Sequence, residues 1–270
     1  SMVATTFAAD TPLAITEFVR GPGIWQNWFW WNLLMGSLLG VFLFSRLWGR
    51  AGVLTDNELL EIRYSGKPAA FLRAFKAGYF AVLYNFIVMG WVINAMASVV
   101  SVMLNMDKWT AVWLCVVIAV VYAILSGFWG VVVTDLVQFV IAMFGSITLA
   151  IIAINHVGGM EILLTKLSEL MGTDVVTENT LKFIPPIPDT GIATKTFWES
   201  PFSKFLIFIS VMWWSHHGTD GGGYIIQRMS SAKNERHALL ATLWYNLAHY
   251  ALRVWPWVIV AVVSIIMFPI

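Results

Sequence analysis

The hydrophobic residues of this chain are gathered into long runs, and the polar residues lie in the segments between them. A helix that crosses a bilayer needs about 20 predominantly apolar residues. The pattern therefore predicts an all-α multi-pass membrane protein with about six full spans and one half helix, in a single transmembrane domain over residues 1–270. The expected spans cover residues 1–19 (the half helix), 24–48, 75–105, 109–125, 131–154, 201–227 (broken) and 238–267.

Both ends of the chain suggest that this domain is truncated. The first apolar run is too short to cross a bilayer alone, and the last run ends directly at Phe268, Pro269 and Ile270. No charged segment with a cleavage site precedes the first run, so no signal peptide is expected. We therefore expect the chain to be a fragment of a longer transporter-like domain.

The composition agrees with a membrane protein and narrows the range of partners. Of the 270 residues, 59% are hydrophobic and 11% are charged, against about 25% charged in soluble domains. The formal net charge of +1 argues against a nucleic-acid partner, which requires a concentrated basic face. The single cysteine, Cys115, cannot form an internal disulfide. The expected partners are the lipid bilayer and a small solute, with no obligate protein partner.

Basic residues predict how the chain is oriented. The loops 46–76 and 228–237 hold nine of the sixteen Lys and Arg residues. Cytoplasmic loops accumulate Lys and Arg near the ends of spans. We therefore expect both loops to be cytoplasmic in a plasma (inner) membrane, and the long polar loop 155–200 to be external.

The stretch WWSHHGTDGGGYIIQR, residues 213–228, interrupts an apolar run with polar residues and three consecutive glycines. Non-helical backbone at membrane depth survives only where it lines a cavity or is buried in protein, so a functional site is expected here. His216, His217 and Asp220 resemble metal ligands by residue type. However, adjacent histidines point apart on a helix and no further ligand completes a tetrahedral set, so a metal site is disfavoured.

Ionisable residues within apolar runs are costly and mark functional sites. Asp10 lies among small residues whose unwound carbonyls could bind Na⁺ beside the carboxylate, or it caps the following helix. Asp135, at the start of a span, has either a functional role or the role of an acid that satisfies the helix N-terminus. Both alternatives stay open for each acid.

The last span carries a second polar face. Asn246, His249 and Arg253 are spaced at one helical turn, so they share a face. The basic side chains could bind an anionic or polyhydroxyl solute. Alternatively, Arg253 could form a structural ion pair with Asp220 or Asp10.

Four stretches in this order resemble the sodium:solute symporter family: ATTFAADTP (4–12), GVLTDNELLEIRY (52–64), GFWGVVVTDLVQ (127–138) and YIIQRMSSAK (224–233). The resemblance implies a leucine-transporter-type core of two inverted five-helix repeats, in which the first and sixth helices are broken. This chain would hold that core from the second half of its first helix to its seventh. Na⁺ is the coupling ion that the resemblance implies.

The resemblance also implies site residues. The backbone carbonyls of Ala4 and Phe7 match sodium ligands, and Asp135 matches an acid on the sodium route; further sodium ligands would follow Ile270. The implied solute-binding residues are Thr11, Trp30, Trp31, Asn32, Ser215 and His249, and Asp220 is a further candidate for solute binding across the site from His249. The expected supporting residues are Asp10, Gly221, Gly222, Gly223 and Arg253. Because Gly222 and Gly223 replace an Asn-Gln pair of the sugar carriers, we do not expect the solute to be bound as galactose is.

The predicted function is therefore sodium-coupled symport of a small polar organic solute by alternating access, with no catalytic residues and no organic cofactor. Two alternatives are a transporter-like solute sensor and a membrane enzyme. A signalling domain would favour the sensor, and turnover of a soluble substrate would favour the enzyme.

Overall fold

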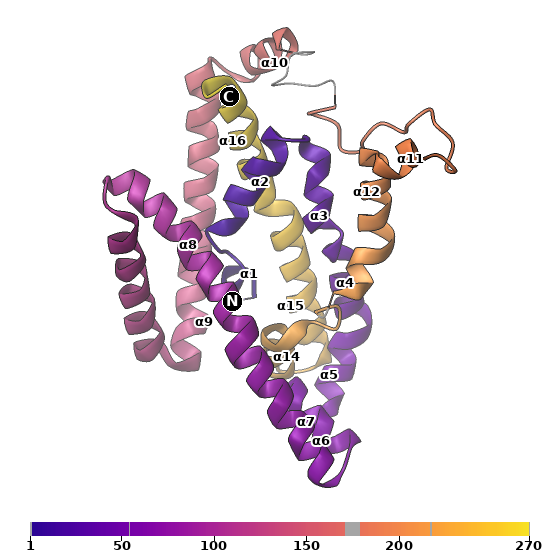
Figure 1. The fold of residues 1–270 in the computed structure, drawn as a ribbon. Helices are drawn as coiled ribbons and strands as arrows, with labels where there is room; N and C mark the ends of the chain where they lie inside the picture. The colour runs from indigo at the N-terminus through magenta and orange to yellow at the C-terminus, as the bar shows by residue number, and fades with distance from the viewer. Residues whose placement is uncertain (1, 54, 171–178, 217, 270) are drawn as a thin grey trace. The chain divides into compact units, whose positions relative to one another are not determined.

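The computed structural model describes residues 2–53, 55–170, 179–216 and 218–269, and all regular secondary structure in these ranges is helical (Figure 1). The α-helices are α1 (Met2–Thr5), α2 (Asp10–Arg20), α3 (Trp28–Trp31), α4 (Leu33–Leu39), α5 (Ser45–Ala51), α6 (Asp56–Arg63), α7 (Gly66–Gly78), α8 (Asn85–Leu104), α9 (Lys108–Val157), α10 (Met160–Glu169), α11 (Lys195–Glu199), α12 (Pro201–Ile207), α13 (Trp213–Ser215), α14 (Gly222–Ser230), α15 (Glu235–Leu247) and α16 (Val254–Met267). A 3₁₀ turn, η1 (Ile24–Asn27), and four π-helical turns join some of them: η2 (Gly40–Phe44), η3 (Tyr79–Tyr84), η4 (Phe208–Met212) and η5 (Ala248–Leu252).

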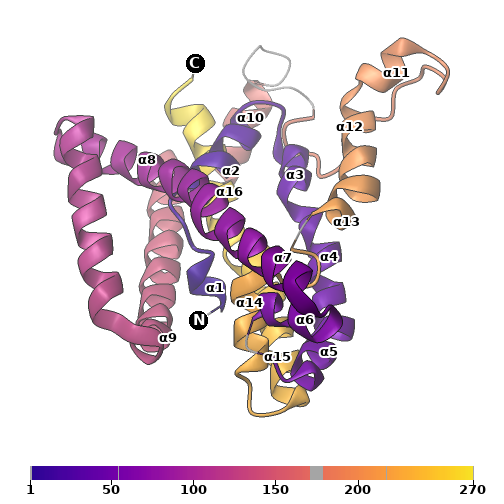
Figure 2. The same ribbon diagram turned by 60° about the horizontal axis from the view of Figure 1, so that its bottom comes forward.

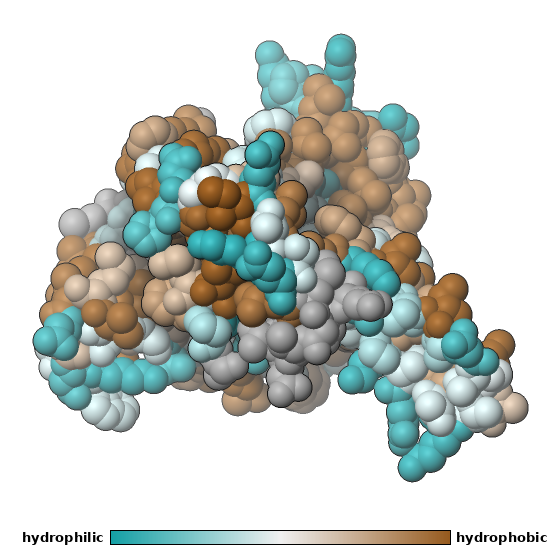
Figure 3. Space-filling view, turned by 90° about the horizontal axis from the view of Figure 1, so that it is seen from above, coloured by the Kyte–Doolittle hydropathy of each residue, from teal (hydrophilic) through white to brown (hydrophobic). Residues whose placement is uncertain are grey.

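Within the described residues, four helical stretches are long and apolar enough to cross a membrane: Ile24–Ala51, Gly66–Leu104, Gly130–Val157 and Glu235–Met267. A shorter apolar helix covers Lys108–Tyr122. Many large apolar side chains on these helices are exposed, and Figure 3 shows some apolar residues beside polar ones on the face seen from above. Exposed apolar side chains in such number are typical of helices that contact lipid or protein. The predicted all-α membrane fold is confirmed.

The chain divides into two compact units. The first unit contains Ser1–Leu13, Ser45–Val140 and Gly222–Ala241. The second unit contains Ala14–Phe44, Ile141–Gly221 and Thr242–Ile270.

In the first unit, α6 folds back on α7, and α14 packs against α1, α5 and α6 (Figure 2). Ion pairs join α6 to α7, through Lys76 with Asp56 (2.7 Å) and Arg73 with Glu61 (2.5 Å), and join α5 to α15 through Arg50 with Glu235 (2.8 Å). Pairs that are exposed to solvent contribute about 0–1 kcal/mol each. Apolar packing therefore has the larger part in holding α6 against α7 and α5 against α15.

Helix α9 reverses its direction although its backbone stays helical (Figure 1). The hydroxyl oxygens of Tyr122 and Thr134 are 2.5 Å apart. In a straight helix two residues at this separation would lie about 18 Å apart along the axis. The axis must therefore turn sharply between them, in the region where the sequence pattern separates the runs 109–125 and 131–154.

In the second unit, the start of the second span is packed against the polar loop. The Thr180 carbonyl accepts a hydrogen bond from the Ile24 backbone N–H (2.8 Å), and the Phe183 carbonyl accepts one from Trp28 Nε1 (2.9 Å). Trp31 stacks on the Phe183 ring with 5.7 Å between centroids. These contacts satisfy backbone groups of the loop while they cover the aromatic start of the span.

Gly36 lies where α4 packs against α13. A Cβ atom added there would lie 3.0 Å from the Trp213 carbonyl oxygen and 3.3 Å from the Thr219 side chain. Thr219 Oγ1 in turn hydrogen-bonds to the carbonyls of Trp213 (3.0 Å) and His216 (2.7 Å), at the end of α13. The glycine therefore permits a close approach of α4 to the end of α13.

We expect Gly36→Val to destabilise the protein by about 1–3 kcal/mol, because overpacking a filled contact costs that much. Thermal unfolding of the purified protein measures the effect. Gly90→Ala is the matched control, since a Cβ at that exposed helical position meets no atom within 4 Å. Equal melting temperatures for the two variants would contradict the close packing.

Two interruptions shape the helices that carry the predicted sites. Residues 6–9 separate α1 from α2, and the chain leaves helical form again between Ser215 and Gly222. The resemblance implies these two breaks. Such breaks expose backbone hydrogen-bonding groups at membrane depth and occur in transporters at binding sites.

Candidate functional site

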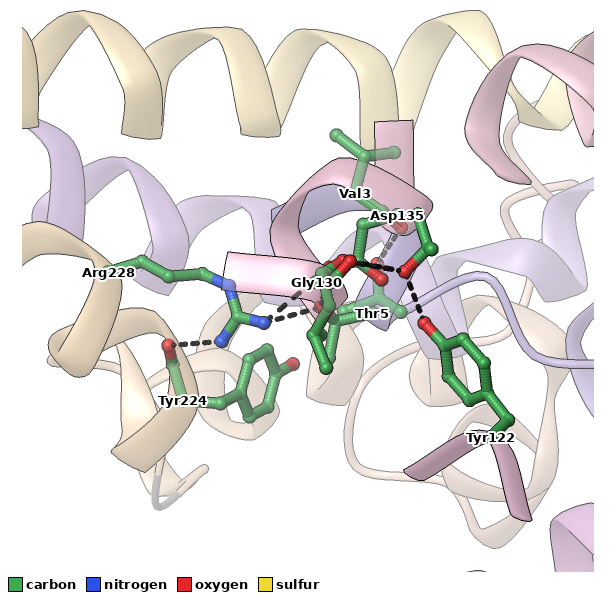
Figure 4. Close-up of polar contacts among 10 residues, drawn as sticks. Val3, Thr5, Tyr122, Gly130, Asp135, Tyr224 and Arg228 are labelled. Carbon is green, nitrogen blue, oxygen red and sulfur yellow. Dashed lines mark hydrogen bonds and ion pairs between the residues drawn. The ribbon is translucent and has the colours of Figure 1, made fainter. Parts of the chain in front are cut away.

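A polar network around the buried Asp135 joins three helices of the first unit (Figure 4). Asp135 on α9 accepts a hydrogen bond from Thr5 Oγ1 of α1 (3.3 Å) and forms an ion pair with Arg228 Nη2 of α14 (3.7 Å). The same Nη2 atom donates to Thr5 Oγ1 at 3.0 Å, and Arg228 Nη1 donates to the Tyr224 carbonyl at 3.0 Å. Each of the three side chains thus contacts the other two.

The charges of this network are withdrawn from solvent. The side chain of Asp135 is 8% exposed and that of Arg228 is 11% exposed. Removing one partner of a buried ion pair costs about 3–5 kcal/mol, because the other charge is left without compensation. The pair therefore couples the position of α14 to the position of α9.

Two hydroxyl groups, those of Tyr122 and Thr134, hold the turn of α9 next to Asp135. Thr134 Oγ1 donates to the carbonyls of Gly130 (2.8 Å) and Val131 (3.1 Å). A hydroxyl has a single hydrogen, so the Tyr122 hydroxyl donates in the 2.5 Å contact with Thr134. These bonds hold the start of the second arm of α9, from which Asp135 projects.

The predicted sodium ligands, Ala4 and Phe7, and the carboxylate of Asp10 lie in or directly beside the first interruption. The Ala4 carbonyl accepts a hydrogen bond from the Phe7 backbone N–H (2.9 Å), and the Ala8 carbonyl accepts one from the Thr11 N–H (3.3 Å). Asp10 is the first residue of α2, and its Oδ2 accepts a hydrogen bond from Trp91 Nε1 (2.6 Å). The interruption thus places carbonyl oxygens and a carboxylate in one short segment.

An aromatic and basic cluster occupies the second unit. The Trp30 ring contacts His249 at 4.8 Å and Tyr250 at 5.0 Å between centroids. The Arg253 guanidinium lies over the Trp30 ring (5.3 Å) and over the Trp257 ring (5.5 Å). The structure thus brings three of the predicted residues, Trp30, His249 and Arg253, into one cluster.

Arg253 is almost completely buried, with 1% of its surface exposed. Its Nε donates to the His249 carbonyl (3.2 Å), and its Nη2 lies 3.2 Å from His249 Nε2. Because an arginine has only donors, this contact requires a neutral His249 whose Nε2 is the acceptor. The cluster therefore fixes the tautomer of the histidine with its proton on Nδ1.

Four other predicted solute-binding residues have contacts or surroundings that do not involve the Trp30 cluster. The Asn32 side chain is buried and donates to the carbonyls of its own helix, and Trp31 stacks on Phe183. Ser215 Oγ donates to the Met212 carbonyl (3.0 Å), and Asp220 is partly buried in the second interruption. The roles of these residues in solute binding stay predictions.

The glycines after Asp220 have a clear backbone role. Gly221 has φ +120° and Gly222 has φ +67°, conformations that residues with a Cβ rarely adopt. The helix resumes at Gly222. A Cβ at Gly223 would approach Asp56 Oδ1 to 3.9 Å, which is ordinary contact. Gly221 and Gly222 therefore permit the change of direction into α14.

The histidine stretch does not resemble a metal centre in the part that the structure describes. His216 Nδ1 accepts a hydrogen bond from the Gly218 backbone N–H (3.1 Å), and His217 lies outside the described residues. Within those residues, no group of three or more His, Cys, Asp or Glu side chains could hold a metal ion.

Several residues of these clusters were not predicted as site residues. Thr5 and Arg228 complete the Asp135 network, Trp91 binds the Asp10 carboxylate, and Trp257 covers Arg253. By its charge alone, Arg228 indicates only the expected orientation of the loop 228–237. Its place in the YIIQR motif was the one signal that could have identified it.

The structure defines a class of protein: a multi-pass helical membrane protein with two interrupted helices and a buried ion pair, an arrangement typical of secondary transporters. The chain belongs to the sodium:solute symporter family, whose model matches residues 1–270. This result confirms the resemblance that the four sequence stretches indicated.

Curated relatives point to the same family. The chain is 28% identical over 242 residues to the sodium/glucose cotransporter 1 of Mus musculus, which covers 88% of this chain and 36% of the relative. It is 29% identical over 245 residues to the Ovis aries protein of the same name (88% and 36%). It is 28% identical over 219 residues to the sodium-coupled monocarboxylate transporter 2 of Mus musculus (81% and 31%). The chain thus spans about a third of the length of these relatives, which are transporters by name.

Proposed function

We propose that the protein containing this chain is a sodium-coupled symporter of a small polar organic solute, working by alternating access. The observation that carries the proposal is the network of Thr5, Asp135 and Arg228, whose two charged side chains are largely buried. It joins the helix before the first interruption, the helix after the second interruption and α9. A cation that changes this network can therefore change the arrangement of both interrupted helices.

Sodium is the cation that fits these groups best. A hard cation prefers carboxylate, hydroxyl and carbonyl oxygens, and this region supplies Asp135, Thr5 and the carbonyls of Ala4 and Phe7. Na⁺ at Asp135 competes with the guanidinium of Arg228 for the same carboxylate oxygen. Entry of sodium would weaken the ion pair, and its release would restore it.

The cluster of Trp30, His249 and Arg253 supports binding of the solute in the second unit. Aromatic rings provide contact area for the carbon skeleton, while the neutral His249 provides directed hydrogen bonding. The backbone freedom of Gly221 and Gly222 allows the second interruption to change shape as the solute binds and leaves. Arg253 is buried behind Trp30, so its part in the cluster is to hold the ring.

We further propose a plasma (inner) membrane location in which the loops 46–76 and 228–237 face the cytoplasm. The concentration of Lys and Arg in these loops supports the orientation. The protein would require the bilayer and its solute, with no nucleic acid, no catalytic activity and no cofactor other than Na⁺ as coupling ion.

Uptake into proteoliposomes that contain the full-length protein tests this function. We expect labelled solute to accumulate when an inward sodium gradient is imposed, because the two fluxes are coupled. Replacing sodium by choline removes the driving ion and is expected to abolish accumulation. Equal accumulation in both media would exclude sodium coupling.

A further inference from the structure

The carboxylate of Asp10 has one satisfied and one unsatisfied oxygen. Oδ2 accepts the hydrogen bond from Trp91 Nε1 at 2.6 Å. Oδ1 is buried and has no hydrogen-bond partner among the described residues. An unsatisfied buried polar group costs about 1–3 kcal/mol, and a charged one costs more. This oxygen therefore has the properties of a group that receives a ligand.

Asp10 lies directly beside the first interruption, where a change in the backbone would uncover Oδ1. It is the first residue of α2, directly after the non-helical residues 6–9. The residue as a whole is only partly buried although Oδ1 is covered. Non-helical backbone at membrane depth lines a cavity or is enclosed by protein. A ligand that enters at the interruption would thus meet the carboxylate.

Trp91 orients this carboxylate from α8. The indole N–H is a donor only, so its bond to Oδ2 leaves Oδ1 as the oxygen available to a ligand. Asn94, one turn further along the same helix, is an exposed amide within the apolar stretch Gly66–Leu104. A polar group facing outward from an apolar helix is typical of a surface that contacts something other than lipid.

The chemistry of Oδ1 selects a donor that carries a positive charge. A protonated amine is a hydrogen-bond donor and also carries a positive charge. A single charge-assisted N–H···O bond from it would therefore satisfy the oxygen and compensate the charge of the carboxylate. A sodium ion would need several further oxygen ligands.

We propose that Asp10 binds a protonated amino group of a solute at a site within the first unit, with Trp91 holding the carboxylate in place. This inference rests on the proposed transport function and narrows it to solutes that contain an amine, such as amino acids or amino sugars. It separates this protein from the relatives named for glucose and monocarboxylates.

Matched pairs of small molecules test the proposal on the full-length purified protein. The pairs are alanine and lactate, glucosamine and glucose, and ethanolamine and ethylene glycol, extended by the common amino acids. Thermal shift in sodium chloride gives the affinity, because a ligand that binds the native state stabilises it. We expect binding from amine members only.

Four variants make the test specific to the carboxylate. Asp10→Asn is expected to weaken amine binding at least tenfold without changing the affinity for sodium, and Asp10→Glu is expected to restore part of the binding. Glu17→Gln removes a charge from an exposed position on the same helix and is expected to have no effect. Trp91→Phe is expected to give an intermediate loss.

The inference fails if no amine of the panel stabilises the wild-type protein, or if a hydroxyl partner binds as tightly as its amine. It also fails if Asp10→Asn alters the sodium dependence but not the preference for amines. Sodium-driven uptake of a neutral solute, without amine binding, would support the proposed symport and exclude the amine site. Amine binding that depends on Asp10, together with uptake that does not depend on sodium, would support the amine site and exclude the proposed symport.

Discussion

Replacing Asp135 with asparagine is expected to reduce sodium-driven uptake at least tenfold and to lower the stability of the protein. The substitution removes the negative charge that binds sodium in our proposal. It also leaves Arg228, 11% exposed, without its ion-pair partner, which costs about 3–5 kcal/mol for a buried pair. Uptake in proteoliposomes and thermal unfolding of the same preparations measure the two effects separately.

A double variant separates the functional effect from the structural one. Asp135→Asn combined with Arg228→Gln removes both charges, so we expect much of the lost stability to return, while sodium-driven uptake stays low. Residues in direct contact usually couple by about 0.5–3 kcal/mol in such cycles. Recovery of uptake in the double variant would show that the pair is structural only. Additive losses of stability would contradict the ion pair itself.

Replacing Arg253 with methionine is expected to cost about 3–4 kcal/mol of stability and to abolish solute binding. The guanidinium lies over the rings of Trp30 and Trp257, and a desolvated cation–π contact contributes about 2 kcal/mol or more. Without it, Trp30 loses the support that holds it against His249. Thermal unfolding reports the packing, and the solute-induced thermal shift reports the binding.

Two further variants control this prediction. Arg253→Lys keeps the charge but lacks the planar group that stacks on the rings, so we expect an intermediate melting temperature. Lys195→Met removes a cation whose side chain is 87% exposed and paired with Glu199 on the surface. Its expected cost is below about 1 kcal/mol. A similar loss from Arg253→Met and Lys195→Met would contradict the stacked arrangement.

The membrane fold could be predicted from the sequence because the length of an apolar run is a local property. The runs beginning near Ile24 and Ala238 lie within the helical stretches Ile24–Ala51 and Glu235–Met267. Asp135 was identified for the same reason, since an acid within an apolar run is conspicuous. The interruption near Gly221 was visible because three consecutive glycines break the helical pattern.

The partners of these residues could not be predicted, because they depend on packing between segments that are distant in the sequence. Nothing in the local pattern shows that Arg228 reaches Asp135, or that Trp91 binds Asp10. The sequence left open whether Asp10 caps α2. Its hydrogen bond to Trp91 and the unsatisfied Oδ1 motivate the amine-binding proposal, while sodium binding and capping by Asp10 stay predictions.

In the proposed mechanism, sodium and solute move together and Asp135 couples their movement. Entry of radioactive sodium into proteoliposomes, measured with and without solute, tests this claim most directly. We predict that solute accelerates sodium entry through the wild-type protein and that Asp135→Asn abolishes the acceleration. Solute uptake without accompanying sodium entry, or full acceleration in the variant, would contradict the account.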